Sequence, residues 1–145
     1  MANTWTDYGI YRMLDITFRS ATGPTACSVR LLTNLTGADV DAENFADLNE
    51  VSAGNGYTTG GNTVTLDSSG FDVLADDSGN NRQYLQLADV QWTASGGSIA
   101  AAGAALVMTD GGTAKVWAIF DFGGTVTATD NGTFTLQNCE LRVGV

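Results

Sequence analysis

The first twenty residues hold the one stretch in which apolar positions follow a helical spacing. Four side chains stand at i, i+3, i+4 and i+8, namely Ile10, Met13, Leu14 and Phe18. This spacing predicts a helix over residues 6–19 with one apolar face. Thr6 or Asp7 can cap its first turn, and the Gly23-Pro24 pair ends it, because proline cannot continue a helix.

From residue 25 onward apolar and polar positions alternate, as they do in strands with one buried face. The predicted strands lie within the runs 27–31, 64–66, 71–74, 84–93, 104–109, 115–122, 125–127, 134–136 and 139–143. A bulge near Ala88-Asp89 is expected, because the apolar positions change parity there. The polar segment 33–49 holds a predicted short helical turn through Phe45 and Leu48.

Turn-forming residues separate the strand runs. Gly111-Gly112 after Asp110 is predicted to turn the chain, and so is Gly123-Gly124. The triplet Asp130-Asn131-Gly132 is a hairpin signal, because Asn-Gly accepts the positive φ of a tight two-residue turn.

The whole pattern predicts an all-β protein with a short N-terminal helix. We expect an N-terminal helical segment or arm over residues 1–24 and a jelly-roll-like β-sandwich domain over residues 25–145. A chain of 145 residues suits one domain with a sizeable core.

A glycine-rich run raises the question of phosphate binding. Residues 50–61 read EVSAGNGYTTGG, which misses a G-x-G-x-x-G spacing by one residue. A phosphate loop follows a strand and opens a helix, whereas residues 62–66 alternate like a strand. No lysine precedes Lys115. The run is therefore interpreted as a turn that places Tyr57 and starts the next strand.

The charge of the chain excludes several partners. Sixteen acidic residues stand against six basic ones, for a net charge of −10. A nucleic acid or an anionic membrane surface would be repelled, so neither is expected as a partner. No apolar run is long enough to span a bilayer, and the N-terminal MANTWTDYG has no signal-peptide pattern.

Candidate chemistry is sparse. The chain has no histidine, which removes the commonest general base and metal ligand. We therefore expect no enzyme activity, no catalytic residues, no cofactor and no metal site. Cys27 and Cys139 lie on the apolar parity of their strands and are expected to be buried and reduced. Calcium at the acidic segments 39–47 or 76–81 is the remaining metal alternative, although neither has the EF-hand spacing.

Four stretches carry a resemblance to a known family. They read WTDYGIYRMLDITFR, DLNEVSAGNGYTTGG, FDVLADD and DVQWTASGGSI, in that order. Together they resemble the small β-rich virion accessory proteins, decoration or tail-associated, of tailed bacteriophages. The resemblance runs from Trp5 to Val145, and its most specific pieces are AGNGYTTGG and WTASGGSI. It implies a structural protein of the virion, assembled in the host cytoplasm, and no catalytic residue.

Three functions are compatible with these features. The first is a capsid decoration (cement) protein that binds the outside of the head, with the major capsid protein or other virion proteins as partners, and that forms a homotrimer. The second is a tail, collar or fibre-base component. The third is a carbohydrate-binding module with a groove lined by Trp5, Trp92 and Trp117, although the last two lie in apolar strands, which favours core packing for them.

The predicted docking segment is Trp5 to Phe18, extended by Arg19. Aromatic and arginine side chains are enriched at the centres of interfaces, and six of them fall here: Trp5, Tyr8, Tyr11, Arg12, Phe18 and Arg19. Alternatively, the apolar face of this helix covers the open end of the sandwich.

Overall fold

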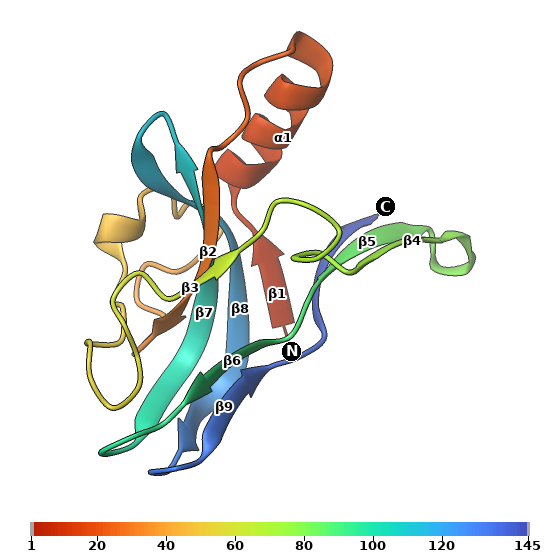
Figure 1. Ribbon diagram of the computed structural model, residues 1–145. Coiled ribbons are helices and arrows are strands. Elements are labelled where there is room, and N and C mark those ends of the chain that lie inside the picture. Colours follow the sequence, from red (N-terminus) through yellow and green to blue (C-terminus); the bar gives the residue numbers. More distant parts are fainter. Residues whose placement is uncertain (1, 145) are drawn as a thin grey trace.

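The computed structural model describes residues 2–144, which form several antiparallel sheets and one α-helix (Figure 1). Strands hold 49% of the chain and helices 13%, so the prediction of a mostly β protein is confirmed.

The main sheet has five strands in the order β1-β8-β7-β2-β3, and all its neighbours are antiparallel. Its strands are β1 (Ala2–Trp5), β2 (Ala26–Leu32), β3 (Asn62–Val64), β7 (Ile99–Asp110) and β8 (Thr113–Ala128). The long β7–β8 hairpin turns at Gly111-Gly112, as predicted.

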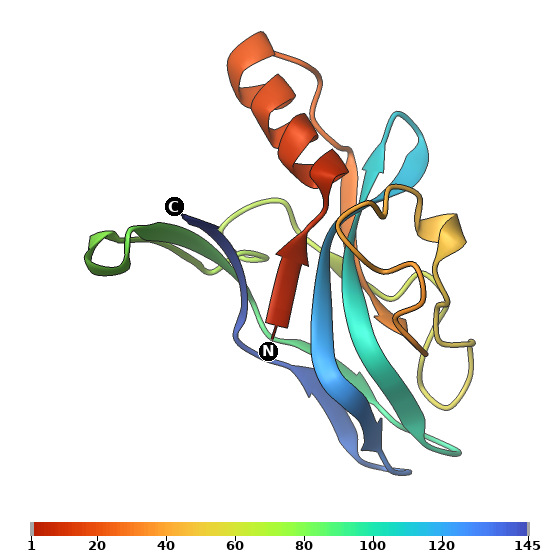
Figure 2. The ribbon, with the colours of Figure 1, turned by 180° about the vertical axis from the view of Figure 1, so that it is seen from behind.

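Two smaller sheets lie on one side of the main sheet. The first pairs β6 (Val90–Thr93) with β9 (Thr133–Leu136). The second, here called the projecting sheet, has the order β10-β5-β4, with β4 (Val73–Asp77), β5 (Arg82–Leu87) and β10 (Cys139–Gly144). The predicted single strand over residues 84–93 is wrong: at Ala88-Asp89, where a bulge was expected, the chain passes from β5 to β6, which belong to different sheets. Figures 1 and 2 show the projecting sheet extending away from the main sheet.

The core lies on both faces of the main sheet. One face packs against β6 and β9, and the buried residues there include Val29, Leu31, Leu106, Phe120, Trp92, Phe134 and Leu136. The other face is covered by the segment after β2, which contains the 3-10 helix η1 (Phe45–Asp47). Phe45 and Leu48 are both buried there, so the predicted helical turn is confirmed.

Two turn predictions need correction. Gly123-Gly124 does not end a strand, because β8 runs without interruption from Thr113 to Ala128. Positive φ angles of 76° and 157° at these glycines instead form a bulge, where the register with β7 shifts. Asp130-Asn131-Gly132 does turn the chain, but it makes no hairpin: β8 pairs with β7 and β9 with β6, so this turn connects two sheets.

The N-terminus contains a strand that the sequence pattern did not predict. β1 is the edge strand of the main sheet and pairs with β8 from Asp121 to Ala118. The helix α1 (Asp7–Arg19) follows at once and confirms the predicted one. Thr6 is its cap: its Oγ1 accepts a hydrogen bond from Gly9 N at 3.0 Å and donates one to Val116 O at 2.6 Å.

The glycine-rich run is a turn, as interpreted from the sequence. Gly54 and Tyr57 exchange two backbone hydrogen bonds of 2.9 Å around Asn55 and Gly56, which both have positive φ. Tyr57 is buried, and its hydroxyl donates to Glu50 Oε1 at 2.7 Å and accepts from Leu31 N at 3.1 Å. The chain then enters β3 and opens no helix.

Candidate docking surface

Helix α1 contacts the body of the protein through Gly9 and through the partly buried Tyr8 and Ile16. Within the helix, which the structure describes in full, Gly9 is the buried residue. It lies so close to β8 that a Cβ there would stand 2.5 Å from the carbonyl oxygen of Trp117. The remainder of the helix projects beyond the end of the main sheet (Figures 1 and 2).

An ionic network fixes the direction of the helix. Arg12 binds both carboxylate oxygens of Asp110 at the tip of the β7–β8 hairpin, with Nη2 at 3.0 Å from Oδ1. It also donates to Asp15 Oδ2 at 2.7 Å and to Thr22 O at 2.7 Å. Tyr8 donates its hydroxyl hydrogen to Asp110 at 3.1 Å. The hydrogen bond from Arg12 lowers the pKa of Asp110, so this carboxylate stays ionised.

The outer side of the helix is apolar and exposed. Four large side chains share it: Ile10, Tyr11, Leu14 and Phe18, of which Phe18 is 78% exposed. We call this set the helix stripe. A helix that buries its apolar face gains most of its stability from that burial. The helix stripe leaves this apolar surface exposed, which is unusual in a protein domain. It is therefore a candidate contact with another molecule.

The structure divides the six predicted docking residues into two groups. Tyr11, Phe18 and Arg19 are exposed on the helix. Trp5, Tyr8 and Arg12 make contacts within the chain: Trp5 donates to Arg142 O at 3.2 Å, and the other two bind Asp110. Arg12 thus positions the helix, a role that the sequence does not reveal because Asp110 lies far along the chain.

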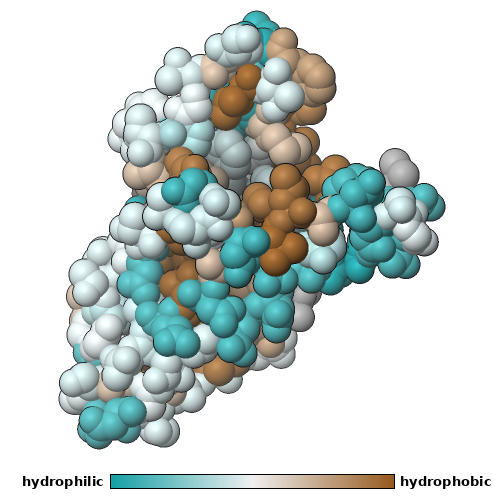
Figure 3. Space-filling model, turned by 45° about the vertical axis from the view of Figure 1, so that its right-hand side comes forward, coloured by the Kyte–Doolittle hydropathy of each residue, from teal (hydrophilic) through white to brown (hydrophobic). Residues whose placement is uncertain are grey.

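An apolar hollow of about 460 Å³ adjoins the helix. Buried residues of the main sheet form its bottom, namely Leu106, Met108 and Trp117. Trp5 and Met13 line the side toward the helix, and Leu66 and Phe71 belong to the loop before β4. Figure 3 shows hydrophobic side chains gathered between the helix and the projecting sheet.

The projecting sheet supplies the opposite wall of the hollow. Leu74 pairs with Leu85, and Leu85 pairs with Leu141, so three leucines form a row across β4, β5 and β10. All three line the hollow. Leu74 is 80% exposed, which shows that this wall remains open to solvent.

One carboxylate lines the hollow, and a second stands farther along β4. Asp67 lines the hollow and is exposed. Hydrogen bonds from Ser69 lower the pKa of Asp67, so it is charged at neutral pH. Asp76 stands two residues after Leu74 on the same, exposed side of β4.

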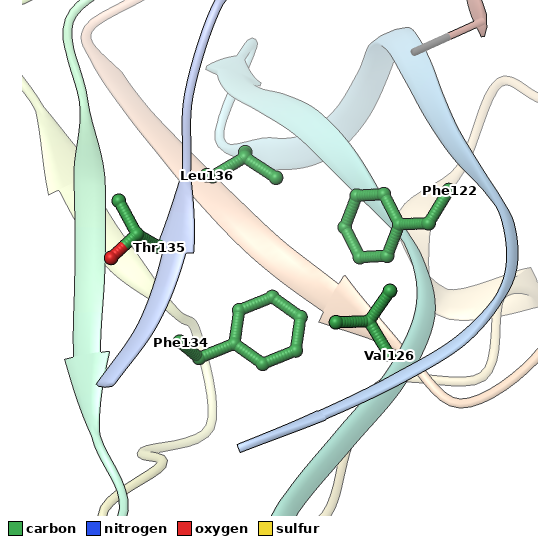
Figure 4. A pocket seen from close by; sticks show the side chains of 5 residues that line it. All are labelled: Phe122, Val126, Phe134, Thr135 and Leu136. Carbon is green, nitrogen blue, oxygen red and sulfur yellow. The ribbon is translucent and has the colours of Figure 1, made fainter. Parts of the chain in front are cut away.

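A smaller apolar opening of about 250 Å³ lies between β8 and β9. Phe122 and Val126 from β8 face Phe134 and Leu136 from β9 (Figure 4). The rings of Phe122 and Phe134 lie 5.9 Å apart. Carbon atoms dominate this opening, and it holds no charged residue that could direct a polar ligand.

The two acidic segments named as calcium alternatives make ion pairs and hydrogen bonds within the chain. Among residues 2–144 no three His, Cys, Asp or Glu side chains are grouped to hold a metal ion. In the acidic segment 39–47, Glu43 binds Lys115 at 2.6 Å, and Asp39 accepts a hydrogen bond from the backbone of Asp41. In the second acidic segment, Asp77 binds Arg82 at 2.7 Å. No helix in this range is long and apolar enough to cross a bilayer.

Comparisons with protein-family models, with curated proteins and with solved structures found no match. The helix stripe and the hollow are the surface features that bear on a functional proposal.

Proposed function

We propose that the chain is a structural protein of a tailed-bacteriophage virion, and specifically a capsid decoration protein that binds the outside of the head and stabilises it. The resemblance of the sequence suggests the class of protein. The exposed helix stripe is the observation that carries the binding role. Two antiparallel layers that face each other fit a jelly-roll-like sandwich, which is the finer description of the fold that we propose.

The helix stripe has the composition of an interface centre. It presents one phenylalanine, one tyrosine and two aliphatic side chains, with Arg19 at its end. Burying one such apolar side chain contributes about 1.5–3 kcal/mol. The binding free energy of each copy can thus be modest, while many copies on symmetric sites together stabilise the shell strongly.

The helix is also held ready for binding. The first half is fixed by Gly9 against β8 and by the Arg12–Asp110 ion pair, whereas Leu14 and Phe18 in the second half are free to meet a partner. A preorganised element loses little conformational entropy when it binds.

The tail, collar or fibre-base alternative uses the same surface and differs in copy number. The carbohydrate-binding alternative has less support, because Trp92 is buried in the core and Trp117 is only 6% exposed where it lines the hollow. A homotrimer remains part of the proposal, and sedimentation of the free protein and of the protein on particles would test it.

The experiment is a binding assay with phage particles that lack the protein. We expect wild-type protein to cosediment with them, and the double variant Leu14→Ser, Phe18→Ser to bind at least about tenfold more weakly. Val126→Ser is the matched control, since Val126 is an exposed apolar residue at the other opening. Deletion of residues 2–19 is unsuitable, because it also removes strand β1.

Two results would contradict the proposal. Wild-type protein that never binds particles would refute the virion role. Equal binding by the wild type and the double variant would refute the role of the helix stripe, provided that both proteins have the same melting temperature.

A further inference from the structure

The hollow adjoins helix α1 beside the helix stripe. Met13 lines the hollow, and Ile10 of the helix stripe stands one turn before it on the same side of the helix. On the other side Leu74 belongs to both the hollow and the exposed surface. A partner that covers the helix stripe therefore also meets the hollow (Figure 3).

The lining of the hollow selects an apolar occupant. Its volume of about 460 Å³ falls in the range of about 300–1,000 Å³ typical of ligand pockets. Polar side chains are confined to Asp67 and Ser68 at one side. A small polar molecule would lose its hydrogen bonds to water there and gain few in return. Leucine- or phenylalanine-like side chains would instead bury their surface against the leucine row.

The charges around the hollow favour an occupant that has basic residues beside its apolar side chains. Asp67 and Asp76 are exposed beside the leucines, and the whole chain carries a net charge of −10. A second copy of the chain would bring the same acidic residues to this hollow, so the homotrimer that we propose is expected to form through another surface. A segment with lysine or arginine beside its apolar side chains is complementary to both features.

We infer that the hollow binds an apolar segment, flanked by lysine or arginine, of another virion protein. This inference rests on the proposed function and names the chemistry of the partner at the same docking surface. The helix stripe and the hollow then form one interface, in which the partner segment lies between α1 and the projecting sheet.

The occupant can be identified by photo-crosslinking on the particle. Benzoylphenylalanine at position 74 replaces one exposed apolar side chain by another, and the same residue at position 46, which is exposed on the opposite side, is the control. We expect position 74 to crosslink to a peptide of another virion protein that contains apolar residues and a nearby Lys or Arg. A crosslink to a second copy of this chain, to a segment without basic residues, or to nothing would overturn the inference.

Variants with a salt titration provide an independent test. Leu74→Ser should weaken binding to particles at least about tenfold without changing the melting temperature, because Leu74 is exposed. Wild-type binding should weaken as salt rises, because salt screens attraction between opposite charges. Asp67→Asn should reduce that salt dependence, because it removes a negative charge that lines the hollow. The variant is conservative, since asparagine can still accept the hydrogen bond from Ser69.

The outcomes separate this inference from the proposed function. If the wild type binds and Leu14→Ser, Phe18→Ser abolishes binding, while Leu74→Ser binds normally, the inference is wrong and the docking role of the helix stands. Binding that strengthens with salt would also overturn it, because that behaviour indicates a partner of like charge. If the wild type fails to bind particles, both proposals are wrong.

Discussion

The attachment of helix α1 gives the sharpest stability prediction. Asp110→Ala removes the carboxylate that binds Arg12 and Tyr8, and it leaves the guanidinium of Arg12 largely buried. The side chains of Arg12 and Asp110 are only 12% and 8% exposed. Loss of one partner of a buried ion pair costs about 3–5 kcal/mol. Arg12 keeps Asp15 and the carbonyl of Thr22, so we expect about 2–3 kcal/mol.

This loss is measurable by thermal unfolding. For a domain of this size about 1 kcal/mol corresponds to about 3 °C, so the melting temperature should fall by about 6–9 °C. A double-mutant cycle with Arg12→Ala should give a coupling energy of about 1 kcal/mol or more. The exposed pair Arg142–Glu140 is the control, and its coupling should stay below about 1 kcal/mol. A coupling below about 0.3 kcal/mol for Arg12 and Asp110 would refute this account of the helix attachment.

The same ion pair predicts a pH dependence. The hydrogen bond from Arg12 lowers the pKa of Asp110 below its unfolded value of about 3.9. Its contribution to stability is therefore fully present well above pH 3.9 and is lost as pH falls through the lower pKa of the folded state. The difference in stability between the wild type and Asp110→Ala should be constant from pH 7 to 5 and shrink in stronger acid. A difference that already shrinks between pH 7 and 5 would show that another group controls it.

Three further predictions concern single residues. Gly9→Ala should lower the free energy of unfolding, measured by chemical denaturation, by about 1–3 kcal/mol, because its Cβ would clash with the carbonyl oxygen of Trp117. This clash outweighs the helix propensity that alanine gains over glycine. A more stable variant would contradict the close contact. Cys27 and Cys139 should react with a thiol reagent only after denaturant is added, since burial raises the pKa of each to about 12; stoichiometric labelling within a minute in buffer would disprove their burial. Phe18→Ser should leave the melting temperature within about 2 °C of the wild type, because Phe18 is 78% exposed, and a larger fall would place it in the core.

The sequence predicts those parts of the fold that depend on neighbouring residues. Helix α1 follows from its spacing and from Thr6, and the turn at Asn55-Gly56 follows from residues that accept positive φ. Strand β1 was missed because four residues show little alternation, and their partners lie more than a hundred positions away. The turn at 130–132 was located, but its partner strands were not, because strand pairing depends on the whole sheet.

For the docking surface too, the sequence predicts only the features that depend on neighbouring residues. The aromatic density of the N-terminal segment pointed to Tyr11 and Phe18, which are indeed exposed. It also pointed to Trp5 and Tyr8, whose partners at Arg142 and Asp110 could not be foreseen from local sequence. The hollow escaped prediction entirely, because its residues come from the N-terminal segment, a loop and five strands.

The leucine row of the projecting sheet illustrates why the hollow cannot be predicted from the sequence. Leu74, Leu85 and Leu141 each look like an ordinary strand residue in the sequence. Only the antiparallel registers β4–β5 and β5–β10 place them side by side. An open apolar wall of this kind is a property of the sheet rather than of any motif.

The most direct measurement of the central proposal is the amount of this protein in purified virions. Quantitative gel densitometry against the major capsid protein gives the number of copies per particle. A decoration protein should be present in tens to hundreds of copies, at a fixed ratio to the capsid subunit. A handful of copies would assign the chain to the tail, collar or fibre base, and its absence from the virion would contradict the account.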